Sequence, residues 1–227
     1  MEQIDKIKAA LTGKAALKQD VFATTLEVFT ELKEELSQIS KELIEFIEPK
    51  DDRIFVDMKS PSKYECQISA AGDTMVFHMH TNVFAFPEEH PFHKSPYISE
   101  HPENGYCGII NIYNFLTDSF RFNRQNDSGY LVGRIFVNRE RHFFVEGRGQ
   151  LGFLFRDFPS SEFTRDKMRE VSEVALLYAI DFDLYTPPYR AVQEVNLGEI
   201  KSLSQDLKLK TAKRLGFQFS STTDPTA

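Results

Sequence analysis

The sequence predicts an α+β protein with a long N-terminal amphipathic helix, a central antiparallel sheet of about seven strands, and C-terminal helices packed on one face of the sheet. Three observations lead to this fold class. Apolar residues recur at helical spacing before residue 48, apolar and polar residues alternate in several segments between 53 and 157, and helical spacing returns after 160. We therefore expect an N-terminal helical segment over 1–48, a sheet domain over 53–216 and a disordered tail over 217–227.

The N-terminal helical pattern is clearest over residues 20–47, where apolar side chains recur three and four positions apart for about four heptads. Thr12-Gly13 separates this pattern from a short helix expected over 2–11, and Pro49 ends it. An apolar stripe of this length either crosses the sheet or pairs with its copy in a second subunit, and we expect a homo-oligomer that associates through residues 20–47. The stripe consists of Phe22, Leu26, Phe29, Leu32, Leu36, Ile39, Leu43, Ile44, Phe46 and Ile47.

The alternating segments predict the strands. Segments 53–59 and 63–70 are typical of half-buried strands, and 74–86 predicts a longer strand that bends near Asn82. After a proline-containing loop over 87–105, the apolar segment 106–115 is expected in the middle of the sheet. Segments 130–137, 142–148 and 149–158 predict a second meander.

Two helices are expected after the sheet. Ser160 is the predicted N-cap of the first, because Met168, Val171, Ala175 and Tyr178 follow at helical spacing. The second is expected from Ser202 to Gly216, and it opens with a capping-box pattern.

The charge and cysteine content limit the function classes. The net charge of −7 argues against bulk binding to nucleic acid or to anionic membranes, and no stretch approaches the roughly 18 apolar residues of a membrane span. Cys66 and Cys107 lie in apolar strand segments without a metal or redox spacing, so we expect reduced, buried thiols in a cytoplasmic protein.

A basic region over residues 121–156 suggests a ligand-binding surface, because it contains seven arginines and only three acidic residues. Alternation places Arg134 on the same strand face as Tyr130. Arg148 lies in the next predicted strand, and Tyr113 lies in the strand expected over 106–115. Arginine binds carboxylates and phosphates with paired donors and stacks on aromatic rings, so these four residues could bind an anion or a nucleotide. The alternative is pairing of the arginines with neighbouring acids such as Glu146.

A histidine-rich stretch over residues 78–93 raises the question of a metal site, because it holds four of the six histidines. His78 and His80 would lie on one strand face about 6–7 Å apart, and His93 or a loop carboxylate could complete a divalent-metal site. The same residue types are typical of a solvated sheet face and loop, which is the interpretation that we favour.

No catalytic residues emerge from the sequence. It contains no nucleophile-elbow motif, and Asp181 and Asp183 form only an isolated D-x-D pair. The glycines over 147–152 predict a tight turn with close backbone contact rather than a phosphate loop. The favoured function is a non-catalytic binding module that self-associates and binds a protein partner or a small acidic ligand. A metal-dependent hydrolase and a nucleotide- or nucleic-acid-sensing module are the alternatives.

Overall fold

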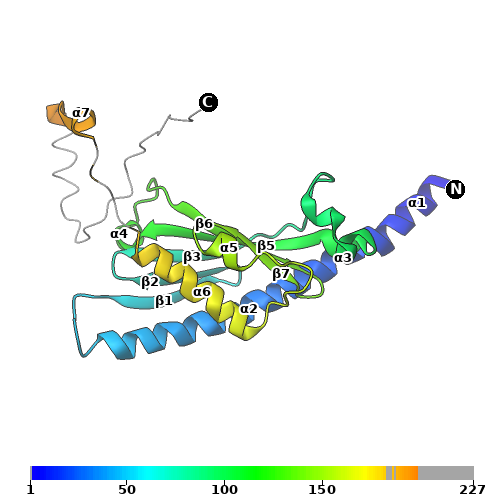
Figure 1. The fold of residues 1–227 in the computed structure, drawn as a ribbon, viewed down its shortest axis with the longest axis horizontal. Coiled ribbons are helices and arrows are strands. Elements are labelled where there is room, and N and C mark those ends of the chain that lie inside the picture. The colour runs from blue at the N-terminus through cyan, green and yellow to red at the C-terminus, as the bar shows by residue number, and fades with distance from the viewer. Residues whose placement is uncertain (1, 183–185, 187, 199–227) are drawn as a thin grey trace.

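A computed structural model describes residues 2–182, 186 and 188–198 and confirms the α+β fold (Figure 1). The helices are α1 (Glu2–Ala10), α2 (Ala16–Ile47), α3 (Pro96–Ser99), α4 (Thr117–Arg121), α5 (Leu151–Leu154), α6 (Arg165–Ile180) and α7 (Tyr189–Val192). The strands are β1 (Val56–Ser62), β2 (Glu65–Ala70), β3 (Asp73–Met79), β4 (Phe84–Ala85), β5 (Tyr106–Leu116), β6 (Tyr130–Asn138) and β7 (Phe143–Gly147). The helix predicted over 202–216 and the tail over 217–227 lie outside the described residues.

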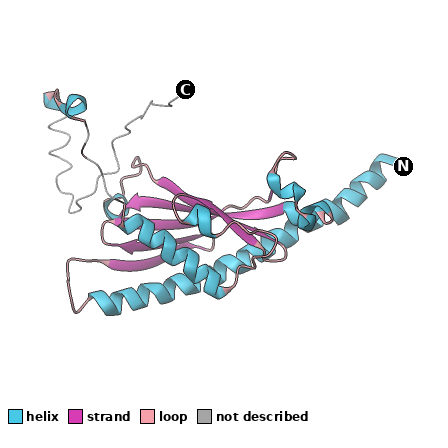
Figure 2. Ribbon diagram, in the orientation of Figure 1, coloured by secondary structure: helices cyan, strands magenta, loops and turns pink. Residues whose placement is uncertain are grey.

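The N-terminal helix continues through the position where we expected it to stop. A π-helical turn over Leu11–Ala15 joins α1 to α2, so the predicted end at Thr12-Gly13 is wrong. A wider turn can accommodate one extra residue without ending the helix, and Thr12 Oγ1 donates to the carbonyl of Lys8 at 3.0 Å within it. The result is a long helical rod whose N-terminal part extends past the end of the sheet (Figure 2).

The sheet has seven antiparallel strands in the order β1-β2-β3-β5-β6-β7, with β4 also paired to β5. The central position predicted for β5 is confirmed. The strand expected over 74–86 is interrupted, because β3 ends at Met79 and pairing resumes only at Phe84.

The strand predicted over 149–158 is wrong, since this segment forms the short helix α5. A Cβ atom at Gly152 would lie only 2.1 Å from the carbonyl oxygen of Gly147. The backbone therefore returns on itself directly after β7, and a helical turn follows where an extended strand cannot. A short apolar run does not distinguish these two outcomes.

Helices α2 and α6 cover one face of the sheet, here called the inner face (Figures 1 and 2). Within the apolar stripe of α2, Phe29, Leu32, Leu36 and Ile39 are at most 4% exposed. They share one core with the inward-facing residues of the strands and with one side of α6. The central part of the stripe therefore crosses its own sheet.

Helix α6 starts later than predicted. Its N-cap is Thr164, whose Oγ1 accepts a hydrogen bond from the backbone N–H of Lys167 at 3.4 Å, and not Ser160. The preceding residues are extended along the edge of the sheet, because the N–H of Phe143 donates to the carbonyl of Ser161 at 2.9 Å. Pairing with β7 thus holds this segment out of the helix.

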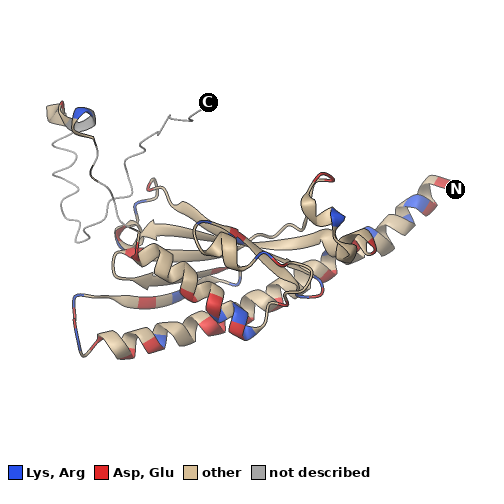
Figure 3. Ribbon diagram, viewed as in Figure 1, with Lys and Arg blue, Asp and Glu red and all other residues tan. Residues whose placement is uncertain are grey.

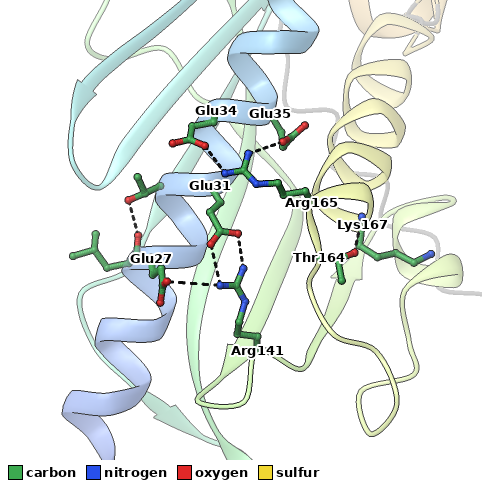
Figure 4. Close-up of polar contacts among 10 residues, drawn as sticks. Glu27, Glu31, Glu34, Glu35, Arg141, Thr164, Arg165 and Lys167 are labelled. Carbon is green, nitrogen blue, oxygen red and sulfur yellow. Dashed lines mark hydrogen bonds and ion pairs between the residues drawn. The ribbon is translucent and has the colours of Figure 1, made fainter.

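Ion pairs link α2 to the rest of the fold (Figure 4). Figure 3 shows the basic and acidic residues along α2 and α6. Arg141, in the turn between β6 and β7, binds both carboxylate oxygens of Glu31, with one Nη1–Oε1 distance of 2.9 Å. At the start of α6, Arg165 contacts Glu34 and Glu35 on the same side of α2. These contacts join α2 to the β6–β7 turn and to the start of α6.

Among the described residues, no helix combines the length and apolar character needed to cross a membrane.

Candidate ligand-binding groove

The opposite, outer face of the sheet carries a groove of about 770 Å³ at its β5–β7 end. Its floor comes from β5, β6 and β7, one wall from the segment after β4, and the far end from the turn that follows β7. The lining residues are Phe84, Ala85, Phe86, Pro87, His90, Pro91, Phe92, Cys107, Ile109, Arg134, Phe136, Phe144, Val145, Glu146, Gly147, Gly152 and Arg156.

Phenylalanine rings form most of the apolar lining. Phe136 and Phe144 lie directly opposite each other on β6 and β7, and their rings stack at a centroid distance of 4.5 Å. Phe86 contacts both rings at 5.8 and 5.6 Å, and Phe92 packs edge-on against Phe144 at 4.7 Å. Together with the buried Phe158, these rings belong to a second apolar core, separate from the one under α2. Such mutual contacts hold the lining in place without a ligand.

The segment over 87–105 supplies the wall and is anchored to β6. Prolines at the first helical positions start its short helical turns, and the side chain of His90 accepts from the N–H of Phe92 at 3.4 Å. The side-chain amide of buried Asn138 donates to Tyr97 Oη at 2.8 Å and to the carbonyl of Asn104 at 3.2 Å. The long loop is thus an ordered wall.

Two arginines and a glutamate supply the charge in the groove. Arg134 and Glu146 face each other across β6 and β7, and Arg134 Nε donates to Glu146 Oε2 at 3.0 Å. The same guanidinium lies 5.5 Å from the centre of the Phe136 ring. Arg156 donates through Nε to the carbonyl of Gly152, and no carboxylate in the described part of the chain pairs with it.

The glycine turn after β7 confirms the tight turn predicted for residues 147–152. Gly149 has a φ of 56°, which favours glycine, and Gly152 packs directly on the backbone of Gly147. This close packing brings Gly152 and Arg156 to the end of the groove.

The four predicted ligand-binding residues are not all brought together. Arg134 lines the groove, whereas Arg148 is exposed beyond β7 and does not line it. Tyr113 lies opposite Leu131, but a bulge in this pairing places Tyr130 opposite Asn114. Opposite residues share a face, so Tyr130 lies on the other face from Tyr113. The predicted grouping of Tyr130 and Arg134 on one face is therefore wrong.

The three histidines considered as metal ligands make different contacts. His78 is exposed on the outer face of β3, His80 Nδ1 accepts from the N–H of Asn82 at 3.0 Å, and a ring nitrogen of His93 lies 3.3 Å from the carbonyl oxygen of Phe86. Within residues 2–182, 186 and 188–198, no group of three His, Cys, Asp or Glu side chains is placed to hold a metal ion. Asp183 of the D-x-D pair lies outside these residues.

A row of polar residues does join two of the predicted sites. Glu65, His78, Asn111, Arg134 and Glu146 are successive cross-strand partners on β2, β3, β5, β6 and β7. They share the outer face, and His78 and Arg134 stand two strands apart, roughly 10 Å. The row leads across the open sheet to the groove.

The sequence did not identify the aromatic lining or Arg156 as parts of a site. The chain has 21 phenylalanines, and their number alone does not show which rings meet in a groove. Arg156 lay in a segment expected to be a strand. No protein-family model, curated protein or solved structure matches this chain, so its function has to be inferred from this geometry.

Proposed function

We propose that this protein is a non-catalytic binding module that holds a small apolar ligand in the groove on the outer face. The observation that supports this proposal is a largely apolar groove of about 770 Å³ whose phenylalanine lining is fixed by ring contacts. Small-molecule sites usually have such a volume, an apolar lining and a few polar groups at defined positions. A preformed lining also lowers the entropic cost of binding.

The alternatives receive less support from the described residues. A metal-dependent hydrolase needs convergent ligands, and His78, His80 and His93 do not converge in the described structure. A nucleotide site built on Arg134, Arg148, Tyr113 and Tyr130 would need side chains that lie on different faces or outside the groove. We therefore assign binding rather than catalysis to the outer face.

A neutral fluorescent ligand tests the proposal. N-phenyl-1-naphthylamine should bind the wild-type protein with a stoichiometry of one, and Ile109→Trp should weaken binding at least tenfold by filling the groove. Ile109 lies on the floor of the groove opposite Phe136, so the larger side chain extends into the groove. Ala23→Trp, at an exposed position on α2, is the matched control and should bind as wild type. Equal binding by both tryptophan variants would show that the groove is not the site.

The fluorescence of the two tryptophan variants also reports where the new side chain lies. The chain has no tryptophan, so each variant has a single indole reporter. Indole emission at short wavelength for Ile109→Trp and at long wavelength for Ala23→Trp would establish that the new side chain fills the groove only in the first variant.

We also propose that self-association involves α1. The stripe residues Phe29, Leu32, Leu36 and Ile39 are buried inside the chain, whereas Ile4, Ile7 and Leu11 are 50%, 53% and 62% exposed on one side of the rod. Such a stripe is typical of helices that pack on a partner.

Sedimentation velocity tests this second part of the proposal. The wild-type protein should form dimers at micromolar concentration, and Ile7→Glu should be monomeric. Ala9→Glu, on the opposite side of the same helix, should remain dimeric. A monomeric wild-type protein would contradict self-association through α1.

The buried cysteines are consistent with the cytoplasmic location that we propose. Cys66 and Cys107 are both free and buried. Thiols of this kind are common in proteins of reducing compartments. We therefore expect the protein to fold and to bind its ligand in a reducing buffer.

A further inference from the structure

The groove contains one positive charge that no acidic side chain in the described residues balances. Arg134 is paired with Glu146, so the charges of these two lining groups cancel. The lining also contains His90, whose pKa is lowered mainly by burial and in part by the neighbouring His93, which disfavours its charged form. Arg156 is the remaining charged group of the lining.

The contacts of Arg156 leave its outer nitrogens available to a ligand. Its Nε donates to the carbonyl of Gly152, and Gly152 is itself held against the backbone of Gly147. This anchor fixes the plane of the guanidinium group. The two terminal nitrogens can then donate in parallel to one carboxylate or similar oxyanion.

On the basis of the function proposed above, we infer that the ligand is an apolar molecule that ends in a single anionic group, with its apolar part against the phenylalanine rings and its anionic group on Arg156. The apolar lining and the unbalanced guanidinium occupy the same groove, so one amphipathic molecule can contact both. A hydrogen bond to a charged group contributes on the order of a tenfold gain in affinity.

The charge distribution favours a single negative charge over a polyanion. A second charge near the first would approach Glu146, which also lines the groove. The net charge of −7 would further oppose the approach of a polyanion such as a nucleoside triphosphate. Fatty acids and aromatic carboxylates or sulfonates have the required chemistry.

A matched pair of dyes tests this inference. 1-Anilinonaphthalene-8-sulfonate has the same aromatic system as N-phenyl-1-naphthylamine and adds one sulfonate. We expect the wild-type protein to bind the sulfonated dye about tenfold more tightly, and Arg156→Gln to remove this difference without weakening the neutral dye. Arg156→Lys, which keeps the charge, should retain part of the preference. Arg148→Gln removes an arginine that does not line the groove and should behave as wild type.

The two proposals fail in different ways. If the neutral dye binds in the groove but the sulfonate adds no affinity, or if Arg148→Gln and Arg156→Gln have equal effects, the inference about the anionic group is wrong and the binding function stands. If neither dye responds to Ile109→Trp, the groove is not a binding site and both proposals are wrong.

Discussion

The contact between α2 and β5 at Gly108 allows a quantitative test of the fold. A Cβ atom at Gly108 would lie 2.2 Å from Thr25 Oγ1 and 2.8 Å from Thr25 Cβ, whereas ordinary contacts begin near 3.4 Å. Gly108→Ala therefore forces α2 away from the sheet by about 1 Å in a close-packed core. Overpacking of this kind costs about 1–3 kcal/mol, and the loss of glycine's backbone freedom returns roughly 0.5–1 kcal/mol. The central values of these two ranges give an expected loss of about 1–2 kcal/mol in the free energy of unfolding.

Urea denaturation followed by circular dichroism would measure this loss, and the melting temperature should fall by roughly 2–8 °C. Thr25→Ala removes the two closest atoms, so the cost of Gly108→Ala should fall to less than half in that background. Gly13→Ala is the control, since a Cβ there meets no atom within 4 Å, and it should leave stability unchanged or increase it. Equal costs of Gly108→Ala with and without Thr25 would refute the assigned packing of α2 on β5.

Three further predictions concern an ion pair, the thiols and the glycine turn. The hydrogen bond from Arg141 holds the pKa of Glu31 below its usual value of 4.5. The ion pair between Glu31 and Arg141 therefore contributes its full stabilisation above the unfolded-state pKa of Glu31, and this contribution is lost as the pH falls through the folded-state pKa. In urea titrations, Arg141→Gln should thus show a smaller loss of stability than the wild-type protein between about pH 5 and pH 3. A steeper loss in the variant would contradict this sign. Burial raises the pKa of Cys66 to about 12 and also raises that of Cys107, so Ellman's reagent should titrate both thiols only after denaturation, and rapid reaction of the native protein would contradict their burial. Gly152→Ala, which introduces a Cβ 2.1 Å from the carbonyl of Gly147, should destabilise the protein by about 1–3 kcal/mol and weaken dye binding in the groove, and unchanged binding would show that the turn does not shape it.

Local patterns predicted most of the elements. Alternation placed Cys66 and Ile68 on the buried side of β2, and helical spacing identified the central buried residues of α2 and one side of α6. It missed the buried Val21 and Val28 and included Phe46, which is exposed. These signals are strong because one side of each element is removed from water, which leaves a period of two or 3.6 in the chain. The predictions failed where a long-range contact decided the backbone. Examples are the residues before Thr164, held extended by β7, and the turn at Gly152, folded on Gly147.

The site was less predictable than the fold. Arg134 was identified because an arginine among aromatic residues can bind an anion and stack on a ring, but whether it pairs with Glu146 depends on the register of β6 and β7. Tyr130 was assigned to the wrong face because a bulge changes the alternation by one residue, and a bulge leaves no periodic signal.

The sequence by itself determined the fold class, the order of most elements and the sides of the strands that face the core, because each of these depends on which side chains avoid water. Only the tertiary structure decided that the central part of the α2 stripe covers its own sheet and that the phenylalanines after β4 line a groove with β6 and β7. It also decided that Arg156 stands in this groove without a balancing acid among the described residues. These outcomes depend on which surfaces meet across long stretches of chain, and the free energy that selects them comes from packing and charge pairing between residues that no local pattern connects.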